Sequence, residues 1–319
     1  MATRGKLRLL SSRYFIAFLS AAYFLALWPF VPDMGSAANL GNLFSNLLPL
    51  LVVTLGETFV LITGGIDLSV TSIVALSSIT GAMVMNGENG LLAGSPWGAP
   101  AAVLVMLAVG ACIGALNGLA VTRLEMPPFI VTLTTMMFFS GLAVWLSGSR
   151  NIDQLPAAFN RVAQQSTVAV AAAVVLAGHW LLRRTVFGQW LYATGMNPRT
   201  SLVSGVPVER TTISAYVISG LLASVASVLY TGRLETGSPV LGQRIFLDVI
   251  AAAVIGGTSL FGGRGTVLGT VLGVLFVALL DNSLNLLGFS FFLVLMAKGA
   301  VILAAALLDA LGSRLIGEA

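Results

Sequence analysis

Residues 99–120 read APAAVLVMLAVGACIGALNGLA and contain no charged side chain. About 20 apolar residues in a helix are enough to cross the hydrocarbon core of a bilayer, whereas a surface helix of a soluble protein carries a polar face. This stretch therefore predicts a membrane-spanning helix. The whole chain has the same character, because 57% of its 319 residues are hydrophobic and only 9% are charged. Soluble domains carry about 25% charged residues, so the composition excludes a soluble fold, whose surface such a chain could not cover.

Outward from this stretch, apolar segments recur along the chain and predict an all-α integral membrane protein. A single domain, residues 1–319, with about ten transmembrane helices is expected. The segments are 14–31, 43–62, 68–85, 99–120, 128–147, 167–182, 212–231, 247–262, 265–280 and 289–308. The first follows a basic start that resembles a signal peptide, but it has no internal cleavage site and is interpreted as a retained span. Segments 247–262 and 265–280 are short, and broken or re-entrant helices are the alternative there.

The distribution of basic residues predicts the orientation. With ten spans and a cytoplasmic N-terminus, the inner loops hold most of the 16 lysines and arginines. These inner residues are Arg4, Lys6, Arg8, Arg13, Arg123, Arg183, Arg184, Arg199, Arg210, Arg264 and Arg314. The outer loops hold Arg150, Arg161, Arg233 and Arg244, and Lys298 lies within the last span. Because basic loops stay on the cytoplasmic side, both termini are expected in the cytoplasm.

The longest inner loop, about residues 183–211, has the pattern of a docking surface. Turn signals at Asn197-Pro198 and Gly205-Val206-Pro207 separate stretches that could be helical, 189–195 and 199–204. A solvated linker is the alternative interpretation. The apolar side chains Phe187, Trp190, Tyr192, Leu202 and Val203 favour contact with another protein instead.

Two spans share a glycine pattern that indicates close helix packing and an internal repeat. Gly110, Gly114 and Gly118 are four residues apart, as are Gly265, Gly269 and Gly273. Glycines at this spacing lie on one helix face and let another backbone approach. The two spans are the fourth and the ninth, and an odd offset of five places equivalent spans in opposite directions. This predicts an inverted-topology repeat, an arrangement common in transporters.

Polar residues at membrane depth are the candidate translocation pathway: Glu57, Thr58, Asp67 and Asn282. Each has a structural alternative. Asp67 with Ser69 could cap the following helix and organise the backbone, and Glu57 could form internal hydrogen bonds. Asp248, Asp281 and Lys298 also lie in or beside the last spans, and Lys298 could snorkel or pair with a carboxylate.

The sequence argues against an enzyme. It has no phosphate-binding loop, because the glycine-rich stretch 256–265 lacks the required lysine. One cysteine and one histidine provide no clustered metal ligands, so no catalytic residue, metal or cofactor is expected. The net charge of +4 is interpreted as a consequence of membrane topology rather than of nucleic-acid binding.

Three blocks resemble a known family. TGGIDLSV at 63–70 resembles a signature of the ribose-type permeases of ABC importers. The stretches 187–198 and 204–208 resemble the cytoplasmic coupling loop of that family, and AAAVIGGTSLFGGRGTVLG at 251–269 resembles its third block. The blocks occur in the family's order, so the chain is identified as a member of the branched-chain amino acid and ribose permease superfamily.

The resemblance implies a type II importer permease, similar in fold to the vitamin B12 permease. Its expected partners are a cytoplasmic ABC ATPase, a periplasmic substrate-binding protein and a second permease, either a copy or a paralogue, in the bacterial inner membrane. Coupling to the ATPase is expected from Gly188, Ala193, Gly195, Asn197, Pro198, Ser204 and Gly205. The expected cargo is a monosaccharide or related polyol. The sequence departs from the family pattern at Glu57, Thr71, Thr194 and Met196.

Other functions remain open at this point. A permease of the same architecture could carry branched-chain amino acids or nucleosides. An ion-coupled secondary transporter would use Glu57 or Asp248 as its carboxylate and would need no ATPase. A passive channel would lack the long docking loop.

Overall fold

The computed structural model describes residues 13–31 and 33–317. The basic residues Arg4, Lys6 and Arg8, on which part of the orientation argument rests, lie outside this range. The described residues form helices joined by short connections, with one isolated β-bridge between Ile152 and Gly237. The helices are α2 (Arg13–Leu27), α3 (Ala37–Ile62), α4 (Val70–Met85), α5 (Gly98–Arg123), α6 (Pro128–Leu146), α7 (Ala157–Arg184), α8 (Val186–Met196), α9 (Pro198–Val203), α10 (Val208–Leu234), α11 (Phe246–Ile255), α12 (Val267–Leu286) and α13 (Phe291–Gly317).

Among the described residues, six helices are long and apolar enough to cross a membrane: α3, α5, α6, α7, α10 and α12. Four shorter apolar stretches, in α2, α4, α11 and α13, lie within other segments that the sequence predicts as spans. The prediction of one helix over 247–262 is wrong in extent. Helix α11 has 10 residues, about 15 Å at 1.5 Å per residue, because Gly256 caps it and Gly257 has a left-handed φ of +84°. A break was the alternative that the sequence left open.

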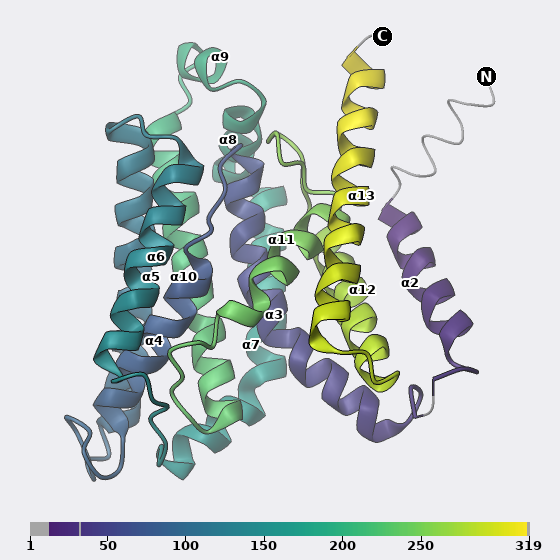
Figure 1. Cartoon of the computed structure of the whole chain (residues 1–319). Helices are drawn as coiled ribbons and strands as arrows, with labels where there is room; N and C mark the ends of the chain where they lie inside the picture. The colour runs from purple at the N-terminus through teal and green to yellow at the C-terminus, as the bar shows by residue number, and fades with distance from the viewer. Residues whose placement is uncertain (1–12, 32, 318–319) are drawn as a thin grey trace.

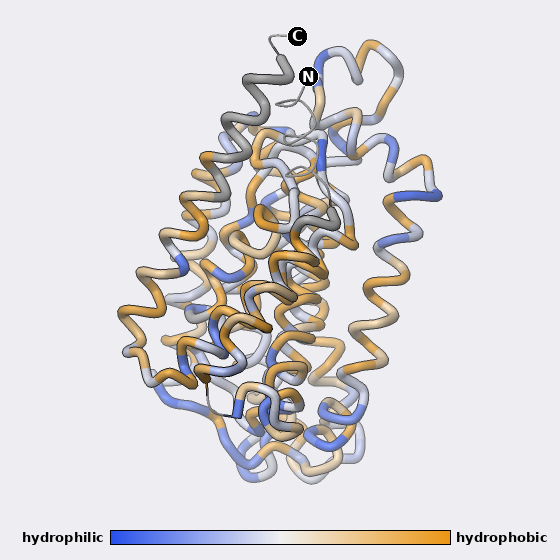
Figure 2. The backbone as a smooth tube through the Cα atoms, turned by 90° about the vertical axis from the view of Figure 1, so that its right-hand side faces the viewer, coloured by the Kyte–Doolittle hydropathy of each residue, from blue (hydrophilic) through white to orange (hydrophobic). Residues whose placement is uncertain are grey.

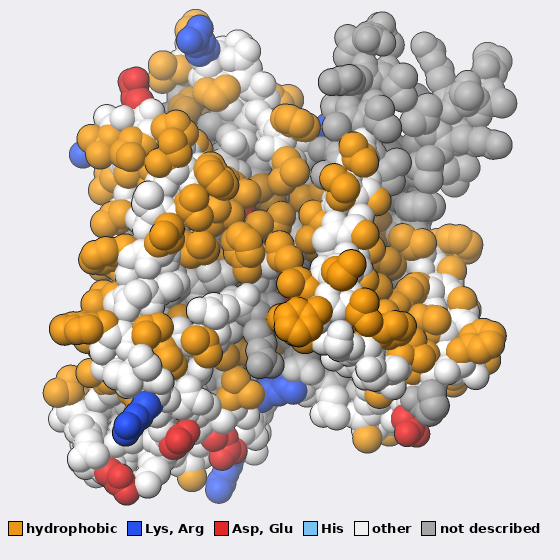
Figure 3. Space-filling model, viewed as in Figure 1, with side chains coloured by type: hydrophobic (Ala, Val, Ile, Leu, Met, Phe, Trp, Pro, Cys, Tyr) orange, Lys and Arg blue, Asp and Glu red, His pale blue; other side chains and the backbone are white. Residues whose placement is uncertain are grey.

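Apolar side chains cover the middle of the molecule. Figure 2 shows hydrophobic residues along the helices and hydrophilic ones gathered in the connections at the two ends. In Figure 3 the lysines, arginines and acidic residues of the visible face lie near the top and bottom, with hydrophobic side chains between them. Leu104, Phe138, Trp145 and Leu176 are all more than 60% exposed. Such a surface suits lipid rather than water.

Helix α3 forms the centre of the bundle. Every residue from Pro49 to Ile62 is buried, and α3 packs against α10, α12, α11 and α7. Pro49 lies inside this helix and removes one of its backbone hydrogen bonds. Figure 1 shows α3 changing direction part-way along its length, as expected at an internal proline.

The contacts between helices recur in two sets. Helices α3 to α6 are followed, after α7 to α9, by α10 to α13. In the first set α4 packs on α5 and on α6, and in the second α11 packs on α12 and on α13. Across the sets α5 packs on α10, as α12 packs on α3, and α4 packs on α10, as α11 packs on α3. In Figure 1 the members of each equivalent pair run in opposite vertical directions.

The two glycine stripes contact different partners. On α5, Gly110 and Gly114 lie against the α10 backbone at Gly220 and Tyr216. The equivalent contact of α12 would be with α3, but Gly269 lies against Gly256, beside α11, and Gly273 against Ala252 of α11. Gly265 lies before α12 begins and faces Ile62. The shared spacing therefore reflects close packing at two unlike places, and the recurring helix contacts are the stronger sign of a repeat.

Candidate functional site

The break between α3 and α4, residues 63–69, begins where a glycine ends a helix. Gly64 has a left-handed φ of +83°, which glycine adopts without steric cost and which commonly ends helices. Thr63 and Gly65 both donate backbone hydrogen bonds to the Val60 carbonyl, at 3.0 and 3.2 Å. Residues 65–67 lie outside any helix or turn, and residues 68 and 69 turn into α4, so α3 ends near α8 while α4 begins further along the bundle (Figure 1).

A buried polar cluster fixes this break. The Asp67 carboxylate accepts hydrogen bonds from the Ser69 backbone N–H at 3.1 Å, the Ser69 hydroxyl at 2.6 Å and the Ser219 hydroxyl at 2.9 Å. The Asp67 N–H donates to Glu57 Oε1 at 3.1 Å, and Asn117 donates to the Ser69 hydroxyl at 2.7 Å. Each of these residues is at most 1% exposed. Hydrogen bonds between buried polar groups hold their elements in one arrangement, so this cluster joins the break to α3, α5 and α10, although Glu57 Oε2 and Asn117 Oδ1 have no partner among the described residues.

The predicted pathway residues lie within packed regions in this conformation. Glu57, Thr58 and Asp67 are enclosed by protein, and Thr58 shares a 2.8 Å hydrogen bond with Thr270 of α12. Asn282 is half-buried and exchanges two hydrogen bonds with Asn39, at 2.8 and 3.0 Å. Asp67 organises the backbone by binding Ser69, whose side chain makes no cap to α4.

The loop at 183–211 contains two short helices, as its turn signals predict. The Thr185 hydroxyl accepts from the Gly188 N–H at 3.2 Å and caps α8. The Asn197 side chain accepts from the Thr200 N–H at 3.0 Å and caps α9, with Pro198 in the first helical position. Both are preferred arrangements at helix N-termini. The Ser201 hydroxyl donates to the Ala193 carbonyl at 2.7 Å and fastens α9 to α8.

The end of α8 lies in backbone contact with the other two sequence blocks. The Gly263 N–H donates to the carbonyl of Ile62, the last residue of α3, at 2.9 Å. A methyl group on Gly195 would collide with that carbonyl and lie 2.5 Å from the Gly263 nitrogen. One on Gly262 would lie 2.8 Å from the Gly195 carbonyl oxygen and 2.9 Å from the Gly64 Cα. We call this contact of residues 62–64, 192–196 and 262–265 the glycine junction.

Tyr192 adds a side-chain bond to the glycine junction. Its hydroxyl donates to the Gly265 carbonyl at 2.8 Å. Burial raises the pKa of this hydroxyl, an effect that the charge of Arg183 partly offsets, so the group stays protonated and able to donate. The α8 helix is thereby attached to the connection between α11 and α12 as well as to α3.

The predicted coupling residues fall into two groups. Asn197, Pro198, Ser204 and Gly205 are exposed at the end of the molecule. In contrast, Gly188, Ala193 and Gly195 are buried or half-buried and face the protein itself. The outer face also carries apolar side chains. Leu202 and Val203, which the sequence analysis named as favouring contact with another protein, are 65% and 90% exposed, and Met196 is 73% exposed. Exposed apolar groups on the polar end of a membrane protein indicate a protein-binding surface.

The sequence could not place the glycine junction. Its glycines lie in three blocks that are separated by more than 60 residues. No pattern within one block predicts that it contacts the other two. The signal in the sequence was the glycines themselves. In the structure Gly64, Gly262 and Gly263 have left-handed φ angles, which residues with a side chain rarely adopt.

Comparison with known proteins adds an independent finding. Residues 39–306 match the family described as "Branched-chain amino acid transport system / permease component". The chain is 40% identical over 290 residues to the ribose import permease protein RbsC of Bacillus subtilis, covering 87% of this chain and 86% of that protein. It is 34% identical to the autoinducer 2 import system permease protein LsrC of Enterobacter sp., covering 87% and 81%, and 30% identical to the xylose transport system permease protein XylH of Escherichia coli, covering 88% and 86%. No solved structure matches the chain.

Proposed function

We propose that this chain, which belongs to the family of branched-chain amino acid transport system permease components, is the membrane subunit of an ATP-driven importer. Its proposed cargo is a monosaccharide or related polyol. The relatives are named for the import of ribose, xylose and autoinducer 2. The family description names branched-chain amino acids instead, so an amino acid is the second candidate cargo.

A separate subunit supplies the energy in this proposal. The chain has no phosphate-binding loop with its lysine, and an ABC ATPase is the partner that such permeases require. We place its docking site on the outer face of α8 and α9, where Met196, Leu202 and Val203 are exposed. A substrate-binding protein on the opposite side of a bacterial inner membrane would deliver the cargo, and a second permease would complete the complex.

The proposed topology has ten crossings with both termini in the cytoplasm. Helices α2, α4 and α11, with 15, 16 and 10 residues, then cross with help from adjoining irregular backbone, which is tolerated where protein encloses it. Helix α13, with 27 residues, is long enough to cross by itself. The break at 63–69 meets this condition, because Asp67 and Ser69 are buried. The recurring helix contacts support an inverted repeat of α3–α6 and α10–α13.

The glycine junction carries the proposed mechanism. When ATP closes the ATPase pair, its grip on α8 and α9 would move the end of α8. That end contacts Ile62 at the end of α3 and Gly263 in the α11–α12 connection. One displacement would therefore reach both halves of the repeat at once. Because packed interfaces switch between discrete arrangements rather than deform continuously, this contact suits a two-state opening of the pathway.

The pathway itself is proposed to involve the polar groups of α3 and the break. Glu57, Thr58 and Asp67 are enclosed here, so they would meet the cargo only after α3, α4 and α12 separate. Asn282 lies further along α12 and pairs with Asn39. In this proposal these residues hold the closed state by hydrogen bonds that the open state exchanges for cargo and water.

Reconstitution tests the function. We expect proteoliposomes containing the chain, its ATPase and a binding protein to accumulate one sugar only with ATP inside the compartment bearing the ATPase. An ATPase variant that cannot hydrolyse ATP is the control and should reduce uptake to background. Uptake of leucine rather than any sugar would show that the cargo is an amino acid, the second candidate. Uptake driven by a sodium or proton gradient without an ATPase would contradict it.

A further inference from the structure

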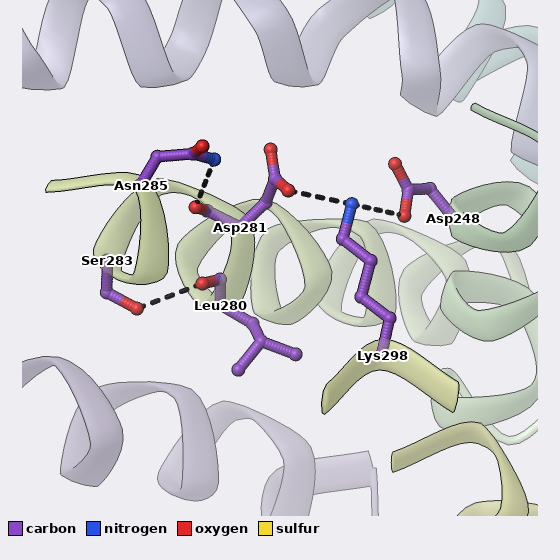
Figure 4. A network of polar contacts seen from close by, with 6 residues as sticks. All are labelled: Asp248, Leu280, Asp281, Ser283, Asn285 and Lys298. Atoms are coloured by element: carbon purple, nitrogen blue, oxygen red, sulfur yellow. Dashed lines mark hydrogen bonds and ion pairs between the residues drawn. The ribbon is translucent and has the colours of Figure 1, made fainter. Parts of the chain in front are cut away.

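Three charged side chains from three helices meet near the end of the bundle opposite α8. The Lys298 ammonium of α13 lies 2.8 Å from the Asp248 carboxylate of α11 and 2.7 Å from the Asp281 carboxylate of α12. Figure 4 shows Lys298 between the two carboxylates. The sequence left the partner of Lys298 open. We call these residues the charged trio.

The charged trio is unequally buried. The side chains of Asp248 and Lys298 are 12% and 10% exposed, whereas that of Asp281 is 42% exposed. Only one Asp281 oxygen pairs with Lys298. Two carboxylates and one ammonium leave one negative charge in excess, and the exposed part of that charge is on Asp281.

The charged trio lies well inside the helices, so the exposure of Asp281 needs an explanation. Asp281 is five residues before the end of α12, and Lys298 is seven residues after the start of α13, about 8 and 10 Å along the helices. A charge that faces hydrocarbon is expensive, so charged side chains at this depth turn toward protein or water. On the same part of α12, Asn282 is half-buried and Asn285 is exposed. This polar strip contrasts with α6, whose 19 residues contain no charge.

We infer that the charged trio lines the water-filled passage and makes it selective for uncharged polyhydroxy solutes. This rests on the proposed function. The free Asp281 oxygen accepts hydrogen bonds from the hydroxyl groups of the solute. Lys298 holds Asp248 and Asp281 in place and neutralises one of them. The remaining negative charge repels anionic solutes such as phosphorylated sugars, in the way that rings of charged side chains select ions in pores.

Cysteine labelling of the assembled complex tests whether the surface is wet. Cys112 is the only cysteine, so Cys112→Ala provides a thiol-free background. We expect Asp281→Cys to react with membrane-impermeant methanethiosulfonate reagents added from the outer side. Gly141→Cys is the matched control, because Gly141 is exposed and also lies five residues before the end of its helix, on the uncharged α6. It should remain unlabelled.

The charge is tested with reagents of opposite sign. Leu284 is half-exposed and one turn from Asp281. We expect Leu284→Cys to prefer the trimethylammonium reagent over the sulfonate reagent by about fivefold relative to free cysteine, as one charge about 8 Å away in water predicts. Adding Asp281→Asn should remove that preference.

Either of two results would overturn the inference: labelling of Asp281→Cys no faster than Gly141→Cys, or a reagent preference that Asp281→Asn leaves unchanged. Labelling requires no transport. If labelling fails in a complex that still imports sugar with ATP, only the proposed role of the charged trio is rejected. If the unaltered chain shows no ATP-driven uptake, the proposed function is rejected.

Discussion

Gly195→Val is expected to stop ATP-driven uptake while the chain still inserts and binds its ATPase. The added carbons would meet the Ile62 carbonyl and the Gly263 nitrogen, which are backbone atoms and cannot rotate away. Overpacking a closed contact costs about 1–3 kcal/mol, and each 1.4 kcal/mol changes an equilibrium about tenfold. The end of α8 would separate from α3, and motion of the docking helices would no longer reach the pathway. We therefore expect uptake to fall about tenfold or more.

The measurement compares uptake with ATP hydrolysis in the same proteoliposomes. Hydrolysis should continue but lose its response to the loaded binding protein, because the outer face of α8 and α9 is unaltered. Gly141→Val controls for valine in place of a helical glycine, since a Cβ at Gly141 would meet no atom within 4 Å. Wild-type uptake by Gly195→Val would show that the glycine junction has no mechanical role.

Gly114→Leu is expected to impair folding rather than the coupling between the ATPase and the pathway. We expect the overpacked contact to cost about as much free energy as the one made by Gly195→Val. A Cβ on Gly114 would collide with the Tyr216 carbonyl and lie 3.0 Å from the Val217 Cα. Gly110 and Gly220 make an equally close contact one turn away. Membrane helices associate through such small-residue contacts because lipid is as apolar as their side chains, so no hydrophobic force drives them together. Forcing α5 from α10 would also disturb Asn117, which holds Ser69 from α5.

The yield of monodisperse protein in detergent and its midpoint of thermal unfolding measure this effect. We expect Gly114→Leu to lower both strongly, and Gly141→Leu, on the exposed face of α6, to leave both near the wild-type values. Equal behaviour of the two variants would mean that the α5–α10 contact does not limit stability.

The predictable part of the fold follows from local chemistry. Apolar runs such as 99–120 need only a bilayer to become spanning helices. Asn197 and Pro198 start α9 through bonds within one turn. The glycines at 256 and 257 end α11 early for the same local reason.

The remaining features depend on contacts between distant segments. Lys298 could have snorkelled, and only the packing of α11, α12 and α13 brings Asp248 and Asp281 to it. The spacing of Gly269 and Gly273 predicted close packing but could not show that α11, rather than α3, supplies the partner backbone. Gly195 looked like part of a docking surface, yet it faces Ile62. A sequence pattern identifies a glycine that needs space, but not the element that fills it.

Cross-linking from α9 tests the central claim that a separate ATPase grips this end of the chain. A photo-reactive residue at position 203, where Val203 is 90% exposed, is compared with one at position 91, where Leu91 is 80% exposed in the α4–α5 connection at the opposite end of the molecule (Figure 1). If the ATPase docks on α8 and α9, position 203 cross-links to the nucleotide-binding subunit of the purified complex and position 91 does not. A cross-link to that subunit from position 91, with none from position 203, would contradict this claim.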